Sequence, residues 1–139
     1  MPEERKYPKV GVAVIVMKGN KVLGGTRLEE HGKGSWCLPG GHLEFNESFE
    51  DAASREAKEE FGIRIKNIRF AAVTNDIFKE TGKHYITVYM KADYDSGEIR
   101  TDEEEMSDAG WYDWANLPTP RFIPLENLLK ENYDPFKND

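Results

Sequence analysis

The chain has 139 residues, 38% of them hydrophobic and 32% charged, a balance typical of one globular domain and not of a disordered chain. Its net charge of −7 argues against a broad basic face for a nucleic-acid polymer, but allows a small phosphorylated ligand whose charge a divalent cation screens. A charged N-terminus, no apolar run near the ~20 residues of a membrane span, and a single cysteine, Cys37, favour a cytoplasmic protein without a membrane partner.

The N-terminal part of the chain predicts a β-hairpin. A short run rich in β-branched residues over 10–17 is typical of a buried strand. A turn at Gly19-Asn20 joins it to a partner strand over 21–27.

A polar segment over 28–35, with two glycines, predicts a mobile loop that leaves His31 at the surface. A short strand over 36–38 follows and ends at Pro39-Gly40-Gly41. We expect this last segment to form a tight turn whose bare backbone can approach a ligand closely.

A helix is predicted from Ser48 to Gly62. Ser48 is a good N-cap, acidic residues follow it in the first turn, and Gly62 is a natural stop. Apolar residues at spacings of three and four give the helix one apolar face, made of Phe49, Ala52, Ala53, Ala57 and Phe61.

The rest of the chain predicts strands over 65–75 and 84–92, a charged loop over 93–110, a strand over 111–114 and a short helix over 124–131. Neither a repeat nor a linker interrupts this order. The sequence therefore predicts a single domain over residues 1–139, of the α/β class, with helices flanking a mixed sheet.

Three carboxylates project from one face of the predicted helix, because Glu56, Glu59 and Glu60 lie at i, i+3 and i+4. Such like-charged neighbours repel by roughly a few tenths of a kcal/mol per pair. A divalent cation reverses that interaction, and carboxylate oxygens are the ligands that Mg²⁺ prefers. The alternative is a solvated acidic face partly offset by Arg55 and Lys58.

The spacing around this triplet is specific. From Gly41 the chain runs five residues to Glu47 and seven more to Arg55-Glu56, and then continues Ala57-Lys58-Glu59-Glu60-Phe61-Gly62-Ile63. Seven fixed residue types at these spacings agree by chance with a probability on the order of 10⁻⁸ at a given start. This pattern is the complete Nudix box, and the chain resembles the Nudix hydrolases.

The resemblance extends beyond the box, to Leu38–Phe45, His84-Tyr85, Trp111–Trp114 and Asn132–Lys137. It is greatest to the MutT-type nucleoside triphosphate diphosphatases, which convert (d)NTPs to monophosphates and pyrophosphate. The resemblance implies an α/β/α sandwich, a Mg²⁺ cofactor for which Mn²⁺ can substitute, a small nucleotide as substrate, and possible homodimers.

By position, the resemblance also implies roles for individual residues. The metal ligands would be the Gly40 carbonyl and the carboxylates of Glu56, Glu59 and Glu60. Catalytic roles fall to Glu59, to Glu60 and to an acidic residue before a late strand, which is Glu105 or, as the alternative, Glu104. An ion pair between Glu47 and Arg55 would orient the helix, and the substrate would contact Arg27, Gly41 and Phe122.

The choice of substrate is the least determined part of this hypothesis. In the MutT-type branch an aromatic pair near the late helix often frames the base, whereas this chain has Phe122-Ile123-Pro124 and lacks one ring. Trp36 either lines a base pocket or belongs to the core. The rival enzyme is an ADP-ribose or nucleotide-sugar diphosphatase, whose members often carry a proline after the box. This chain has none between Pro39 and Pro118.

Two further readings are weaker. Dinucleoside polyphosphate hydrolases often show a tyrosine where this chain has Glu80-Thr81. A non-catalytic nucleotide sensor on the same fold would be expected to lose a carboxylate of the box, and all of them are present.

Overall fold

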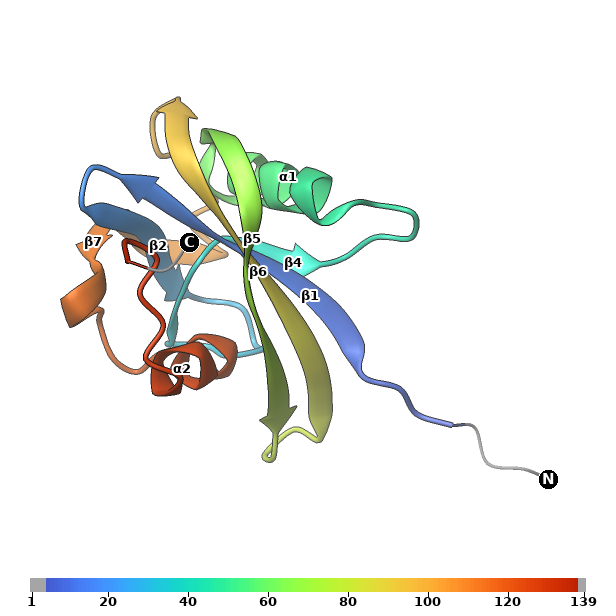
Figure 1. Cartoon of the computed structure of the whole chain (residues 1–139). Coiled ribbons are helices and arrows are strands. Elements are labelled where there is room, and N and C mark those ends of the chain that lie inside the picture. The colour runs from blue at the N-terminus through green and yellow to red at the C-terminus, as the bar shows by residue number, and fades with distance from the viewer. Residues whose placement is uncertain (1–4, 138–139) are drawn as a thin grey trace.

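The computed structural model describes residues 5–137, and a mixed β-sheet lies at its centre (Figure 1). The strands run in the order β3–β2–β1–β6–β5, with β4 paired to β1 and β7 paired to β2. The elements in chain order are β1 (Lys9–Lys18), β2 (Lys21–Arg27), β3 (Trp36–Cys37), β4 (Gly40–His42), α1 (Phe49–Phe61), β5 (Arg64–Phe78), β6 (Lys83–Ser96), β7 (Met106–Asp113), a 3₁₀ turn (Trp114–Asn116) and α2 (Ile123–Lys130). Within residues 5–137, no helix has the length and apolar character needed to span a membrane.

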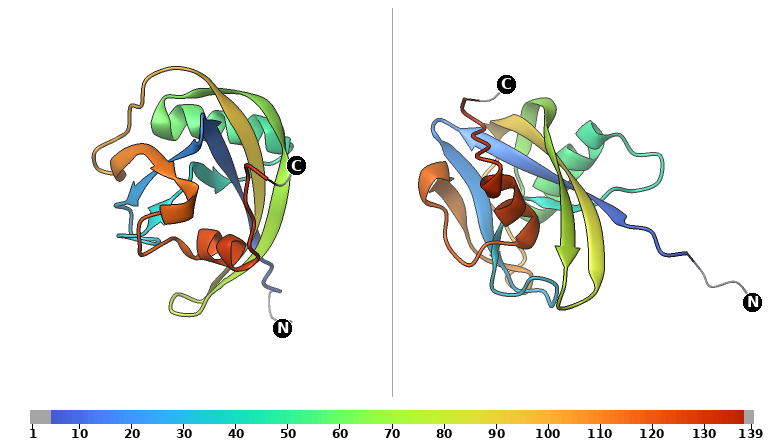
Figure 2. Two further views of the ribbon diagram at one scale, coloured as in Figure 1. Left: turned by 60° about the vertical axis from the view of Figure 1, so that its left-hand side comes forward. Right: turned by 60° about the horizontal axis from the view of Figure 1, so that its bottom comes forward.

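The sheet separates two hydrophobic cores, because successive side chains of a strand point to opposite faces. Along β1, Val12, Val14 and Val16 pack with the buried face of α1, whereas Ile15 packs with α2. Strands β1 and β6 are parallel and the other pairs are antiparallel. The two helices thus cover different faces of one mixed sheet (Figure 2), which confirms the predicted α/β/α class.

Helix α1 begins and ends as predicted. The Ser48 hydroxyl accepts the Asp51 N–H at 3.1 Å, and Gly62 has φ of 70°, a left-handed conformation that favours glycine. Phe49 departs from the predicted apolar face, since it is 39% exposed at the start of the helix.

The predicted loop over 93–110 is wrong at both ends. Strand β6 continues to Ser96, and β7 already begins at Met106. The extension of β6 pairs with the start of β5 through bulges, with Arg64 opposite Ser96 and Lys66 opposite Asp93. Charged and polar residues make up most of this ladder. Ile65 and its partner Tyr94 pack against the core, but one such pair does not give the repeated apolar alternation that identifies a strand in a sequence.

The diglycine is a strand and not a turn. Gly40 and Gly41 lie in β4, opposite Ala13 and Val12 of β1. A Cβ added to Gly40 would stand 2.8 Å from the Val12 carbonyl oxygen, and one added to Gly41 would stand 2.7 Å from the Glu56 carboxylate. The bare backbone of the diglycine therefore lets β4 pack closely against β1 and against the Glu56 carboxylate of α1.

Candidate active site

A cavity of about 400 Å³ opens beside α1, between β1, β4, β6 and the start of α2. Glu56 and Glu60 line it together with Gly40 and Gly41 of β4. The third carboxylate of the triplet, Glu59, is not part of this lining, and its side chain is 61% exposed. The structure therefore brings two glutamates of the triplet into the cavity lining and leaves the third outside it.

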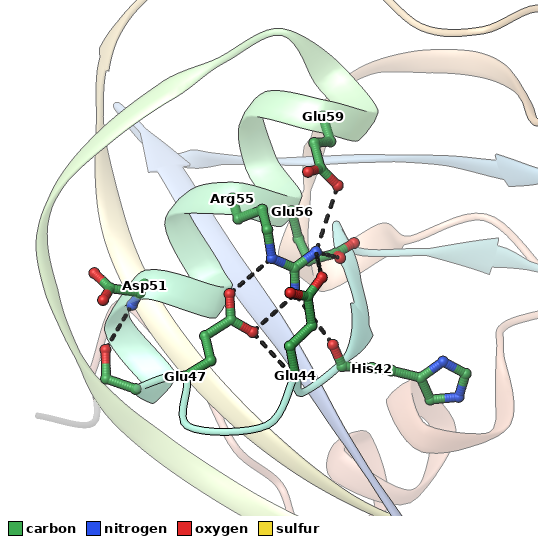
Figure 3. Close-up of polar contacts among 8 residues, drawn as sticks. His42, Glu44, Glu47, Asp51, Arg55, Glu56 and Glu59 are labelled. Atoms are coloured by element: carbon green, nitrogen blue, oxygen red, sulfur yellow. Dashed lines mark hydrogen bonds and ion pairs between the residues drawn. The ribbon is translucent and has the colours of Figure 1, made fainter.

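Arg55 joins the carboxylates around the helix (Figure 3). Its Nε donates to Glu47 Oε2 at 2.7 Å and its Nη2 donates to Glu47 Oε1 at 2.9 Å, which makes a bidentate pair. Nη1 donates to Glu56 Oε1 at 2.5 Å and lies 3.4 Å from Glu59 Oε2. Nη2 also donates to the His42 carbonyl at 3.1 Å. One guanidinium thus fixes α1 against β4 and against the segment between them.

The Arg55 hydrogen bonds lower the pKa of Glu47 to about 2, and the same bonds to Glu47 raise the pKa of Arg55. Both groups are therefore charged at neutral pH. The predicted pair of Glu47 and Arg55 is in contact, and the position of Arg55 beside Glu56 links it to the cavity.

Burial has the opposite effect on the two cavity carboxylates. It raises the pKa of Glu60 to about 8, against a hydrogen bond that Glu60 Oε1 accepts from the Gly40 N–H at 2.7 Å, while the neighbouring Glu56 raises it further. Burial also raises the pKa of Glu56, against its hydrogen bond to Arg55. Two adjacent carboxylates, Glu56 buried and Glu60 half-buried, form a donor set of hard oxygens that fits a divalent cation such as Mg²⁺.

Among residues 5–137, no three His, Cys, Asp or Glu side chains already stand in the arrangement of a metal site. The contacts explain this. Glu59 is turned toward Arg55, and Glu60 accepts the backbone N–H of Gly40.

The raised pKa of Glu60 leads to a prediction about stability. Its folded-state pKa of about 8 exceeds an ordinary 4.5, so between these values the folded state binds more protons and the free energy of unfolding falls as pH rises. In metal-free protein, Glu60→Gln is expected to raise the melting temperature by a few degrees at pH 8, with the difference vanishing near pH 4.5. Scanning calorimetry in a chelator checks this, and a difference independent of pH would contradict it.

Glu105 lies in the loop before β7, as predicted for the distal acid. It shares a small second cavity with Glu60, Arg27 and Glu29. Partial desolvation and the nearby carboxylates of Asp102, Glu29 and Glu104 raise the pKa of Glu105. The alternative, Glu104, does not line this cavity, and its N–H donates to Asp102. Of the two candidates, Glu105 is the one that lines this cavity.

The far end of the main cavity is aromatic. Phe122, the residue before α2, lies with its ring centroid 5.7 Å from that of Phe78 and 5.3 Å from that of His31. Tyr85 completes the group, with its ring 5.9 Å from Phe78. Thus Phe122 has ring partners, but they come from the loop over 28–35, the end of β5 and β6, and sequence analysis missed them.

His31 is where the sequence prediction was wrong. The loop folds back, so the ring of His31 is half-buried in the aromatic group and lines the cavity. Burial, followed by the charges of Lys83 and Arg27, lowers the pKa of His31 to about 4, and the ring is therefore neutral at pH 7. Trp36 belongs to the core, at 1% exposure, and does not line the cavity.

Arg27 stands between the two ends of the cavity. Its guanidinium carbon is 4.3 Å from the Phe122 ring centroid, and its Nε donates to the His31 carbonyl at 2.8 Å. It lines both the main cavity and the small one that holds Glu105. The structure thus arranges carboxylates, a cation and aromatic rings in sequence along one cavity.

Comparison with known proteins identifies the family of this chain. The family described as the NUDIX domain matches residues 7–134. The chain belongs to the Nudix family. A solved structure of a MutT NUDIX hydrolase from Burkholderia pseudomallei is similar over 88% of this chain and 99% of that chain, with a TM-score of 0.80 and 29% identity.

Curated proteins similar to this Nudix domain include NAD-capped RNA hydrolases. The chain is 34% identical over 127 residues to the NAD-capped RNA hydrolase NudC of Photorhabdus laumondii, and 37% identical over 117 residues to that of Yersinia enterocolitica. These matches cover 91% and 83% of this chain but 47% and 43% of the relatives. The chain therefore spans less than half the length of these relatives.

Proposed function

We propose that this Nudix domain hydrolyses (d)NTPs to monophosphates and pyrophosphate, with Mg²⁺ held by the carboxylates of Glu56, Glu59 and Glu60 and by the Gly40 carbonyl. Mn²⁺ is the expected substitute. The observation that carries the proposal is the single cavity whose lining joins the carboxylates of Glu56 and Glu60, Arg27 and an aromatic end. Phosphates beside the metal and a base among the rings would occupy its whole length.

The residues divide the chemistry between them. When bound, the cation supplies charge neutralisation to the phosphates and acidifies water in the site. Arg27 contacts phosphate oxygens, and a carboxylate accepts the proton of the attacking water. The hydroxide then attacks one phosphorus in line while the other phosphate leaves with the electrons of the broken P–O bond. No covalent intermediate with the protein is needed, and the buried Cys37, whose pKa burial raises to about 12, is not suited to be a nucleophile.

Glu105 is our choice for the group that takes this proton. It shares a cavity with Glu60 and Arg27, and partial desolvation and the neighbouring carboxylates raise its pKa. Glu59 and Glu60 then act as catalytic metal ligands, and Glu47 acts through Arg55 on the position of Glu56.

A second candidate substrate has support from the relatives' names. Proteins 34% and 37% identical to this chain are called NAD-capped RNA hydrolases, so a diphosphate linkage between two nucleosides is a competing choice. The net charge of −7 weighs against an RNA polymer, though not against NAD itself. The missing proline after the box continues to weigh against ADP-ribose.

A substrate panel tests the proposal. Turnover with Mg²⁺ is measured on dNTPs, oxidised dNTPs, NAD, NAD-capped RNA, ADP-ribose and sugar nucleotides, with the products resolved by mass. We expect triphosphates to be the best substrates and to release pyrophosphate. Cleavage of NAD into two mononucleotides, with triphosphates untouched, would transfer the assignment to the second candidate. Failure to cleave any of them would favour a nucleotide-sensing domain.

A further inference from the structure

A fully buried carboxylate lies behind the aromatic end of the cavity. Asp76 of β5 has no exposed surface. Its Oδ2 accepts the hydroxyl of Thr87 at 2.5 Å and that of Thr74 at 3.1 Å, and its Oδ1 accepts Asn127 Nδ2 at 2.9 Å. Three neutral donors thus satisfy a buried acidic group, which would be costly to bury without them.

Thr87 is the member of this network that reaches the ligand space. Thr74 and Thr87 are register partners across β5 and β6, and both are buried. Thr87 lines the cavity, whereas Thr74, Asp76 and Asn127 do not. Because the Thr87 hydroxyl hydrogen is donated to Asp76, only the lone pairs of Oγ1 remain for a ligand. Asp76 therefore makes Thr87 an acceptor and not a donor.

Gly11 leaves an open space beside this acceptor. It pairs with Thr87 across β1 and β6 and lines the same cavity. A Cβ added to Gly11 would stand 3.9 Å from Thr87 Oγ1 and 3.6 Å from the Gly41 carbonyl oxygen. With no side chain at Gly11, both oxygens border the cavity there, so a ligand group lying over Gly11 has two acceptors nearby. A group with two N–H donors suits two acceptors.

We propose that the space over Gly11 recognises the exocyclic amino group of a nucleobase, with Thr87 Oγ1 and the Gly41 carbonyl as acceptors and Asp76 as the residue that sets the polarity of Thr87. The inference rests on the proposed function in one respect, that the base occupies the aromatic end. Adenine, guanine and cytosine carry such a group. Uracil carries an oxygen in place of the amino group of cytosine, and hypoxanthine and purine carry a hydrogen in place of the amino groups of guanine and adenine.

The test measures dissociation constants of nucleoside monophosphates by calorimetry, which does not depend on hydrolysis. Three pairs differ at the amino group: CMP and UMP, GMP and IMP, and AMP and purine riboside monophosphate. In the pair whose base fits the cavity, we expect the nucleotide with the amino group to bind at least about tenfold tighter than its partner. In none of the three pairs should the nucleotide without the amino group bind tighter. Pairs that all agree within twofold, a tighter UMP, or no measurable binding of any monophosphate would overturn the inference.

Matched variants show which residue causes the preference, measured as the ratio of the two dissociation constants within a pair. Thr87→Val is expected to bring this ratio near one. Thr74→Val removes the other hydroxyl bonded to the same Asp76 oxygen, so it should lower stability in a similar way yet leave the ratio unchanged. Equal loss of the ratio in both variants would show a merely structural network and overturn the inference.

Gly11→Ala gives an independent readout if Thr87→Val folds poorly. Its new methyl group meets its neighbours at ordinary van der Waals distances, so the fold should persist while the space over Gly11 is filled. The ratio is again expected to fall toward one, and an unchanged ratio would overturn the inference. An amino preference without cleavage of any nucleotide would refute the proposed function alone. Cleavage without the preference would refute the inference alone.

Discussion

Glu60→Gln is expected to lower turnover at least about a hundredfold while the protein remains folded. Glutamine keeps an oxygen that can accept the Gly40 N–H, which Glu60 now accepts at 2.7 Å, so the contact between α1 and β4 is preserved. It cannot supply the anionic oxygen that a divalent cation requires. Steady-state kinetics with Mg²⁺ on the best substrate of the panel measures the effect.

The matched control is Glu50→Gln, which removes one negative charge from an exposed position in the first turn of the same helix. It should leave turnover close to that of the unmodified protein. Near-normal turnover by a folded Glu60→Gln protein would remove the basis for assigning the cavity as a metal-dependent active site.

Arg55→Lys is expected to weaken the apparent affinity for Mg²⁺ by roughly 10–100-fold, the range found when groups that orient metal ligands are changed. A lysine ammonium cannot form the bidentate pair with Glu47 and at the same time contact Glu56 and the His42 carbonyl. The loss should therefore appear mainly in the Mg²⁺ concentration needed for half-maximal turnover. The rate at saturating Mg²⁺ should fall less.

Arg64→Lys is the control for this change, because Arg64 is exposed at the start of β5. Its Mg²⁺ dependence should match that of the unmodified protein. If Arg55→Lys left the Mg²⁺ dependence unaltered, Arg55 would have a role in stability only, and a melting curve would show that role separately.

The carboxylate end of the site was accessible to sequence analysis because it is local. The N-cap, the acidic triplet and the glycine stop all lie within one helix, where fixed spacings determine which side chains share a face. The pairing of Arg55 with Glu47 follows from the same box. In contrast, the choice between Glu104 and Glu105 depends on how a loop turns before β7, and no periodicity encodes that geometry.

Of the aromatic end, only Phe122 was accessible to sequence analysis, through the resemblance. The rings around it come from three other segments that lie far apart in the sequence and contain His31, Phe78 and Tyr85. Their proximity results from the pairing of β5 with β6 and the return of the loop over 28–35. Asp76 gave no signal either, since a lone acidic residue in a strand is ordinarily exposed.

Arg55 holds the segment between β4 and α1 against the helix, because it contacts His42, Glu47 and Glu56 together. The pKa of Glu47 is depressed from 4.5 to about 2. Its contribution to the stability of the folded state is therefore complete above pH 4.5 and is lost only as pH falls toward 2. The segment therefore stays closed under all but strongly acidic conditions. An arriving nucleotide meets carboxylates whose backbone is already ordered, and little conformational entropy is lost on binding, so more of the contact energy appears as affinity.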